Sequence, residues 1–239
     1  MRRVLLVGLL LLALALGVGG GYYAGDRWNT PGPTASGTAG PLGTVSPSPT
    51  PTPTPTEPSL PVKTPVPNNA DPLQPGLDYA NRTFTVHPKE QQPVQLSIDI
   101  PQGWGLTRDP KRTDEVKFVD KDRQHGVRVQ ALEPATQTPK DAIAQLIIDL
   151  RKSQAPENDV RIVEQSNDVI TGDDGRSRAV GTLIYTFIPG DTLRYVIVRF
   201  IAISGELADI SMSITGIPED APALKEILQK ASASVSEND

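Results

Sequence analysis

Apolar and polar residues alternate most clearly between residues 94 and 100. The apolar positions are Val94, Leu96, Ile98 and Ile100. A period of two predicts a strand with one face toward solvent. The run ends in "PQGWG", where a proline and two glycines predict a turn around Trp104. Weaker alternation predicts strands near residues 115–120 and 126–131, joined as a hairpin by the polar segment "KDRQH".

A different periodicity follows in "TPKDAIAQLIIDLRKS", which begins at Thr138. Thr138 suits an N-cap and Pro139 the first helical position. One face carries an apolar stripe of Ile143, Leu146, Ile147 and Leu150. The segment from Thr138 to Lys152 is therefore predicted to be an amphipathic helix. A second stripe predicts a closing helix at residues 221–235.

Two long runs between these helices are apolar on both faces. They are "RAVGTLIYTFI" and "LRYVIVRFIAIS", separated by "PGDT" at residues 189–192. Such strands are typical of the centre of a sheet that is covered on both sides. Further strands are predicted at residues 160–166 and 207–215, and "GDDG" at residues 172–175 predicts a hairpin turn. Residues 77–236 are thus expected to form one α+β domain, a mainly antiparallel sheet sandwiched by helices.

The N-terminus has the pattern of an export segment. Two arginines precede an apolar run, and the 21 residues from Val4 to Ala24 are long enough to span a bilayer. Aromatic residues suited to the membrane interface lie near the outer end of this run, at Tyr22, Tyr23 and Trp28. Residues 1–28 are predicted to be a retained single-pass plasma-membrane anchor, in the membrane through residues 4–25. The N-terminus would be cytoplasmic and the domain outside. Small residues at 13–17 leave an alternative, secretion after signal cleavage.

Residues 29–76 have the composition of a linker. From Thr30 to Pro75 the chain has 14 prolines in 46 residues, with mostly Thr, Ser and Gly between them. Proline fixes φ and lacks an N–H, so this segment is predicted to be a disordered spacer that favours extended polyproline II conformation. Its composition also suits O-glycosylation, and an unmodified spacer is the simpler interpretation.

Composition excludes several classes of function. The chain has no cysteine, which removes disulfides, thiolate metal sites and a lipid-modified cysteine. From Leu77 onward there are 25 Asp and Glu against 19 Lys and Arg, a difference of −6. An acidic domain argues against a nucleic-acid partner, because phosphates require a basic face. No metal-ligand spacing, nucleophile motif or phosphate loop is present, so no metal, cofactor or catalytic residue is predicted.

The order of these elements, the "IPQGW" turn and the "TPKDAIAQLI" helix resemble the PsbP-like fold. The resemblance covers about residues 77–235 and is greatest to the LpqN-like envelope proteins of actinobacteria. Members of that group are typically lipoproteins, and this chain lacks the cysteine required for that modification. The resemblance implies a non-enzymatic accessory or ligand-binding module at the outer face of the membrane. It provides no active-site residues.

Few single residues point to a site. His87 and His125 lack metal-ligand spacing and are predicted to be surface residues. Trp104, between two glycines, is a candidate ligand platform, although a tryptophan after a strand more often caps the core. Arg194 and Arg199 interrupt an apolar strand and have opposite pleat phases, because their separation is odd. One of them could meet a buried acid or an anionic ligand, and a solvated edge is the simpler interpretation.

The expected function is that of a membrane-anchored, extracytoplasmic binding or accessory protein of the cell envelope, with an envelope protein or lipid as its partner. The alternative is an envelope enzyme, a hydrolase or transferase, with a carboxylate site that the motifs do not identify.

Overall fold

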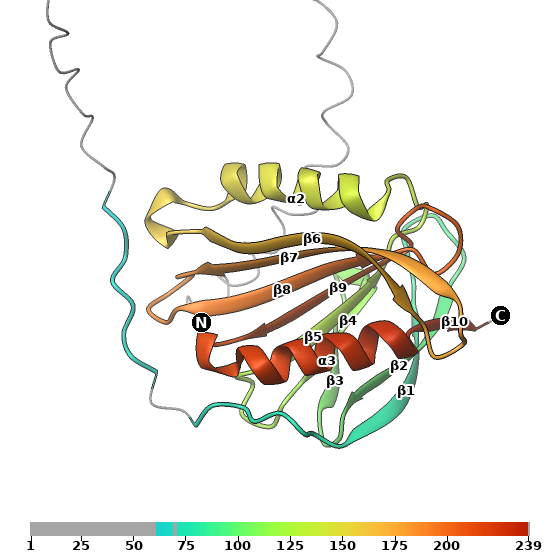
Figure 1. Cartoon of the computed structure of the whole chain (residues 1–239), viewed down its shortest axis with the longest axis horizontal. Coiled ribbons are helices and arrows are strands. Elements are labelled where there is room, and N and C mark those ends of the chain that lie inside the picture. Colours follow the sequence, from blue (N-terminus) through green and yellow to red (C-terminus); the bar gives the residue numbers. More distant parts are fainter. Residues whose placement is uncertain (1–60, 69–70, 239) are drawn as a thin grey trace, which may run out of the picture. The chain divides into compact units, whose positions relative to one another are not determined.

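The computed structural model describes residues 61–68 and 71–238, which contain two antiparallel sheets and two α-helices (Figure 1). The larger sheet has seven strands in the order β3 (Gly105–Asp109), β4 (Arg112–Val119), β5 (Gly126–Ala131), β9 (Ile210–Gly216), β8 (Arg194–Ile201), β7 (Ser177–Phe187) and β6 (Arg161–Thr171). The smaller sheet has the order β1 (Tyr79–Val86), β2 (Val94–Pro101) and β10 (Ser236–Asn238). The helices are α2 (Pro139–Ser153) and α3 (Ala221–Ser234), and 3₁₀ turns span Pro156–Asn158 and Pro218–Asp220.

The two faces of the larger sheet have different covers. Helix α2 packs against β7 and β8 on one face. On the other face, α3 and the smaller sheet enclose the main core, which includes Phe84, Phe118, Ile197 and Leu224. The rings of Phe84 and Phe118 meet edge to face at 5.5 Å and so join the smaller sheet to the larger one. Strands β7 and β8 are therefore covered on both sides, as their apolar sequences predict.

Local sequence explains where α2 begins and how closely it packs. The Thr138 hydroxyl accepts a hydrogen bond from the Asp141 amide at 3.2 Å, which is the predicted N-cap. Beneath the helix, a Cβ at Gly181 would lie 2.5 Å from the Pro139 carbonyl oxygen, so only glycine permits this approach of helix to strand. Leu146 and Leu150 of the predicted stripe are buried.

The structure confirms the α+β class, both helices and the hairpins predicted at residues 172–175 and 189–192. The sequence interpretation missed three strands, β1, β3 and β10, and with them the second sheet. Strand β1, "YANRTFTV", has one clear apolar pair near its end, and β3 has an exposed, mostly polar pattern. Strand β10 is only three residues long. None of the three has the repeated alternation on which strand prediction depends.

Part of the predicted linker is described and contacts the domain. The Lys63 ammonium donates to the Asn158 side-chain oxygen at 2.6 Å. Further along, the Leu73 amide donates to Asp220 and the Gly76 amide to Glu226, both at 2.7 Å. Contacts with the folded domain therefore begin before Leu77. The predicted anchor, residues 1–28, and linker residues 29–60 lie outside the described residues. Within the described residues, no helix is both long and apolar enough to cross a membrane.

Candidate anion-binding site

One row of paired residues crosses the larger sheet and changes character along its length. Backbone register places Leu183, Val198, Ser213, Arg128 and Lys117 side by side on the face that α2 covers. The row is apolar at β7 and β8, under α2, and cationic at β5 and β4. Lys117 and Arg128 are direct cross-strand partners. Like charges in this arrangement destabilise a sheet unless another group compensates them.

Glu115 provides that compensation. The Glu115 side chain is 2% exposed and meets three cations, Arg112, Lys117 and Arg128. These four residues are called the Glu115 cluster. Arg112 Nη2 lies 2.9 Å and Arg128 Nη1 3.5 Å from Glu115 Oε2, and Lys117 Nζ lies 3.9 Å from Oε1. Period-two spacing places Glu115 and Lys117 on the same face of β4. One buried carboxylate thus binds cations from two strands.

The cluster has more positive than negative charge. In and around it lie four cations, which are the three of the cluster and Arg108. Three acids face them: Glu115, Asp114 at 3.6 Å from Arg112, and Asp109, whose charge acts on Lys117. The balance among these residues is +4 − 3 = +1. Burial lowers the pKa of Lys117 and the charge of Glu115 raises it; the charges of Arg128 and Arg112 lower the pKa further, and that of Asp109 raises it. In a domain whose total charge is negative, this local cationic excess favours binding of an anion.

A hollow of about 150 Å³ adjoins the cluster. Its lining is Thr107, Arg108, Asp109, Glu115, Val116 and Lys117. Since a water occupies about 30 Å³ of liquid, the hollow matches roughly five waters. It is smaller than pockets for drug-sized ligands, which start near about 300 Å³. A small anionic group such as a phosphate or carboxylate fits this space. A larger hollow, of about 370 Å³, lies between the start of α2 and β6 and β7.

Only 10% of the His125 side chain is exposed, so its predicted surface position is wrong. His125 Nδ1 lies 2.7 Å from Asp120 Oδ2, and Nε2 lies 2.8 Å from Asp220 Oδ2. Each ring nitrogen of His125 therefore has a carboxylate oxygen within hydrogen-bond distance. Asp220 is fully buried and also accepts the Ile217 and Leu73 amides. His87, by contrast, is exposed as predicted.

Of the three residues predicted for binding, Trp104 and Arg194 contact neighbouring residues of one turn, His125 and Gln124, whereas Arg199 contacts α3. Trp104 is only 8% exposed, belongs to the main core and stacks on the His125 ring at 6.5 Å between centroids. Arg194 Nη1 donates to the Gln124 carbonyl at 3.3 Å and connects β8 to the β4–β5 turn. Trp104 thus occupies the position of a core cap, and Arg194 bridges two parts of the sheet.

Arg199 lies on the α3 face, opposite in phase to Arg194. Its Nε donates to Thr182 Oγ1 at 2.9 Å and its Nη1 to Ser232 Oγ at 3.2 Å. Burial lowers the pKa of Arg199 to about 10, and the charges of Asp168 and Glu164 oppose that shift. The side chain therefore connects β7 and β8 to α3.

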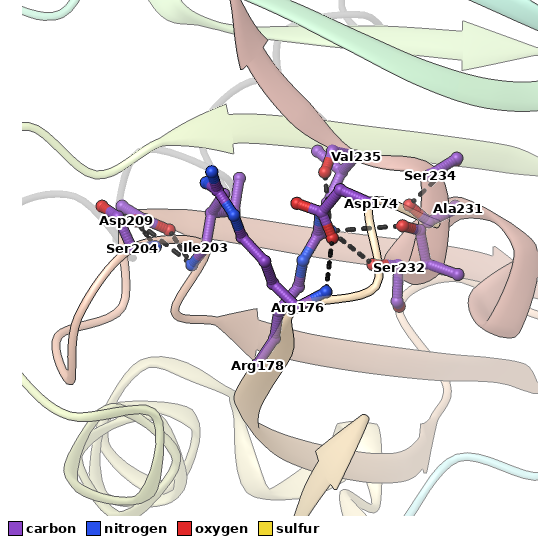
Figure 2. Close-up of polar contacts among 11 residues, drawn as sticks. Asp174, Arg176, Arg178, Ile203, Ser204, Asp209, Ala231, Ser232, Ser234 and Val235 are labelled. Atoms are coloured by element: carbon purple, nitrogen blue, oxygen red, sulfur yellow. Dashed lines mark hydrogen bonds and ion pairs between the residues drawn. The ribbon is translucent and has the colours of Figure 1, made fainter. Parts of the chain in front are cut away.

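A third arginine, Arg178, was not singled out from the sequence. It is 1% exposed, and its Nη1 donates to the carbonyls of Ser232, Ala233 and Val235 at the C-terminus of α3 (Figure 2). Nη2 pairs with Asp174 at 3.1 Å. A cation at this end of a helix satisfies its unpaired carbonyls and complements its dipole. Arg178 is therefore a structural cap, whereas the Glu115 cluster adjoins a hollow.

Comparison with known proteins gives little information on function. No family model matches the chain, and no curated protein matches it. Among solved structures, the Saccharomyces cerevisiae Ran-binding protein Mog1p is similar at 12% identity and a TM-score of 0.43, over 66% of this chain and 96% of Mog1p. PA94 of Pseudomonas aeruginosa, a protein of unknown function, is similar at 14% identity and a TM-score of 0.34, over 62% of this chain and 94% of PA94. These TM-scores are low, and neither similarity assigns a function. The described residues contain no cluster of His, Asp and Glu suited to a metal ion.

Proposed function

We propose that this protein is a non-enzymatic, membrane-anchored binding protein of the cell envelope, and that its extracytoplasmic domain binds the anionic group of an envelope lipid or protein at the Glu115 cluster. Residues 4–25 would hold it in the membrane, and residues 29–60 would separate the anchor from the domain. The sequence resembles PsbP-like and LpqN-like proteins, and this resemblance supports an accessory role at the outer face of the membrane.

The observation that carries this proposal is the direct pairing of Lys117 with Arg128 beside a hollow of about 150 Å³. A sheet selected only for stability would place an acid or a neutral residue at one of these positions. Glu115, Asp114 and Asp109 carry one charge fewer than the four cations around the hollow, so an incoming anion would relieve the remaining repulsion. Departures from local stability rules are expected at functional sites.

The alternative is an envelope hydrolase or transferase, and the Asp120–His125–Asp220 arrangement is the observation that favours it. A histidine between two carboxylates is a component of many acid–base sites. Here both ring nitrogens are already engaged, and Trp104 stacks on the ring. The arrangement therefore has the contacts of a structural bridge. Turnover of an envelope polymer or lipid that is lost in Asp120→Asn would favour the enzyme.

Binding can be tested with the full-length chain in detergent micelles. The probes are inorganic phosphate and micelles doped with phosphatidylglycerol, with phosphatidylcholine as the neutral comparison. Lys117→Gln should weaken binding about 10- to 100-fold, the effect of losing one hydrogen bond to a charged group. Binding should also weaken as salt increases.

The matched control is Lys111→Gln, the same loss of charge at an exposed residue next to β4. It should bind like the wild type. Equal binding by the two variants, or no salt dependence, would show that the Glu115 cluster is not the binding site. If phosphate binds and doped micelles do not, the ligand is a soluble anion or a protein carboxylate and not a lipid headgroup.

A further inference from the structure

The two edges of the larger sheet differ in how they are protected. Strand β3 has five residues, carries a bulge between Thr107 and Asp109, and its Arg108 donates to the Thr85 carbonyl. Strand β6 has 11 residues and, in the described chain, pairs with β7 alone. Nearly all of its residues are exposed, and Val169 is 71% exposed. A long, exposed edge strand is a template for pairing with another strand.

The hydrogen-bond phase of β6 shows which backbone groups face outward. Gly172 donates to the Arg176 carbonyl, which identifies a hydrogen-bonded pair at the turn. Hydrogen-bonded and non-hydrogen-bonded pairs alternate along an antiparallel ladder. The backbone amides and carbonyls of Ser166 and Asp168 therefore bond to β7. The Ala179 carbonyl, opposite Val169, accepts instead from the amide of Ala202, which directly follows β8. The amides and carbonyls of Gln165, Asn167 and Val169 therefore point away from the sheet.

The sequence of β6 is chemically symmetric about Ser166. From residue 162 to residue 170 it reads Ile, Val, Glu, Gln, Ser, Asn, Asp, Val, Ile. An antiparallel copy centred on Ser166 would pair Ile162 with Ile170, Val163 with Val169, Glu164 with Asp168 and Gln165 with Asn167. In that register the outward-facing Gln165 and Asn167 meet as a hydrogen-bonded pair. Apolar side chains thus lie opposite apolar side chains, and amide side chains opposite amide side chains.

One pairing in this register is unfavourable by itself. Glu164 would lie opposite Asp168 of the second copy, and like charges in this position repel. Each copy supplies cations on the same face. Lys225 Nζ lies 3.1 Å from Glu164 Oε2, and the charge of Arg199 acts on both Asp168 and Glu164. The bulge between Ile162 and Glu164 ends the regular ladder, so the regular pairing spans residues 164–168 of each copy, and Val169 lies directly at its border, opposite Val163 of the second copy.

We infer that β6 is a dimerisation edge, at which two copies of this chain pair antiparallel about Ser166 and join their seven-stranded sheets into one. A closed two-fold contact of this kind uses the same strand in both copies and leaves no free edge at β6. It leaves the Glu115 cluster, on β4 and β5, outside the interface. This inference is therefore independent of the proposed function.

The absence of cysteine permits a direct test with the full-length chain in micelles. A single Ser166→Cys substitution would place two thiols across a non-hydrogen-bonded pair, where Cα atoms are about 4.5 Å apart, within the range of a disulfide. Mild oxidation should convert this variant to a reducible, covalent dimer. Thr171→Cys, exposed on the same strand, should not react, since its two copies would lie roughly 33 Å apart.

Three further variants test the register and the interface. Gln165→Cys and Asn167→Cys should cross-link more slowly than Ser166→Cys; a maximum at either would disprove the register centred on Ser166. Val169→Lys should convert the untreated chain from dimer to monomer in sedimentation analysis without a change in its melting temperature, because the side chain is exposed. A monomeric wild type, or equal cross-linking at residues 166 and 171, would overturn the inference.

Discussion

Arg178→Met is the substitution that most directly tests how α3 is held. Methionine retains most of the apolar stem and removes the guanidinium group that caps the helix. Arg178 Nη1 reaches the carbonyls of Ser232, Ala233 and Val235 at 3.2, 3.3 and 2.6 Å (Figure 2). The Ala233 carbonyl also accepts the Asp173 amide at 2.9 Å, so it keeps a partner in the variant. The carbonyls of Ser232 and Val235 lose the donor.

The expected loss follows from these contacts. Each buried acceptor left without a partner costs about 1 to 3 kcal/mol, so two cost about 2 to 6 kcal/mol. Part of this is offset, because the variant no longer buries a cation whose Nε has no hydrogen-bond partner. The free energy of unfolding should therefore fall by about 2 to 5 kcal/mol.

Urea denaturation, followed by the fluorescence of buried Trp104, measures this loss. Arg176→Met is the matched control, because Arg176 is exposed two residues away on the same hairpin, and its midpoint should stay at the wild-type value. Arg178→Lys keeps the charge and loses the forked donors, so its urea midpoint should lie between those of Arg178→Met and Arg176→Met. If Arg178→Met unfolds at the same urea concentration as Arg176→Met, the cap does not stabilise α3 and the reasoning is refuted.

Three further predictions concern the core, alkaline pH and the anchor. Leu146→Ala should lower the free energy of unfolding by about 2 to 5 kcal/mol, because Leu146 is one of the buried residues of α2. An unchanged urea midpoint would mean that the apolar stripe of α2 is an interface for a partner. Burial raises the pKa of Tyr185 to about 12, above its unfolded value of about 10. Stability should therefore be lost as pH rises from about 10 to 12, and Tyr185→Phe should reduce that loss in alkaline denaturation. Mass spectrometry should find the mature N-terminus intact, and a new terminus between residues 14 and 26 would contradict a retained anchor.

The elements that could be predicted from sequence are those whose residues follow a period. Strand β2 alternates strictly, and α2 has both a cap at Thr138 and an apolar stripe, so both were located within about a residue. Strand β3 is exposed, and β10 is three residues long and pairs only with β2. Their pairing depends on tertiary contacts, which local pattern does not contain.

The position of His125 shows the same limit at the level of one side chain. Its neighbours in sequence are polar, which favours a surface turn. Its burial depends on Asp220, 95 residues away, and on Trp104. A partner so distant in sequence leaves no periodic signal near His125.

The charged groups of this domain differ in whether their partners balance them, and that difference locates the candidate site. Buried Asp220 meets His125 and two amides, and Arg178 meets carbonyls and Asp174, so each has partners that suit its charge. Glu115 meets three cations, two of which face each other across the β4–β5 ladder. Removing Glu115 would leave Lys117 and Arg128 opposite each other without the carboxylate that both contact, whereas adding an anion would supply a further negative charge. An anion that bound there would therefore stabilise the domain, and its effect should be largest where Lys117 is intact.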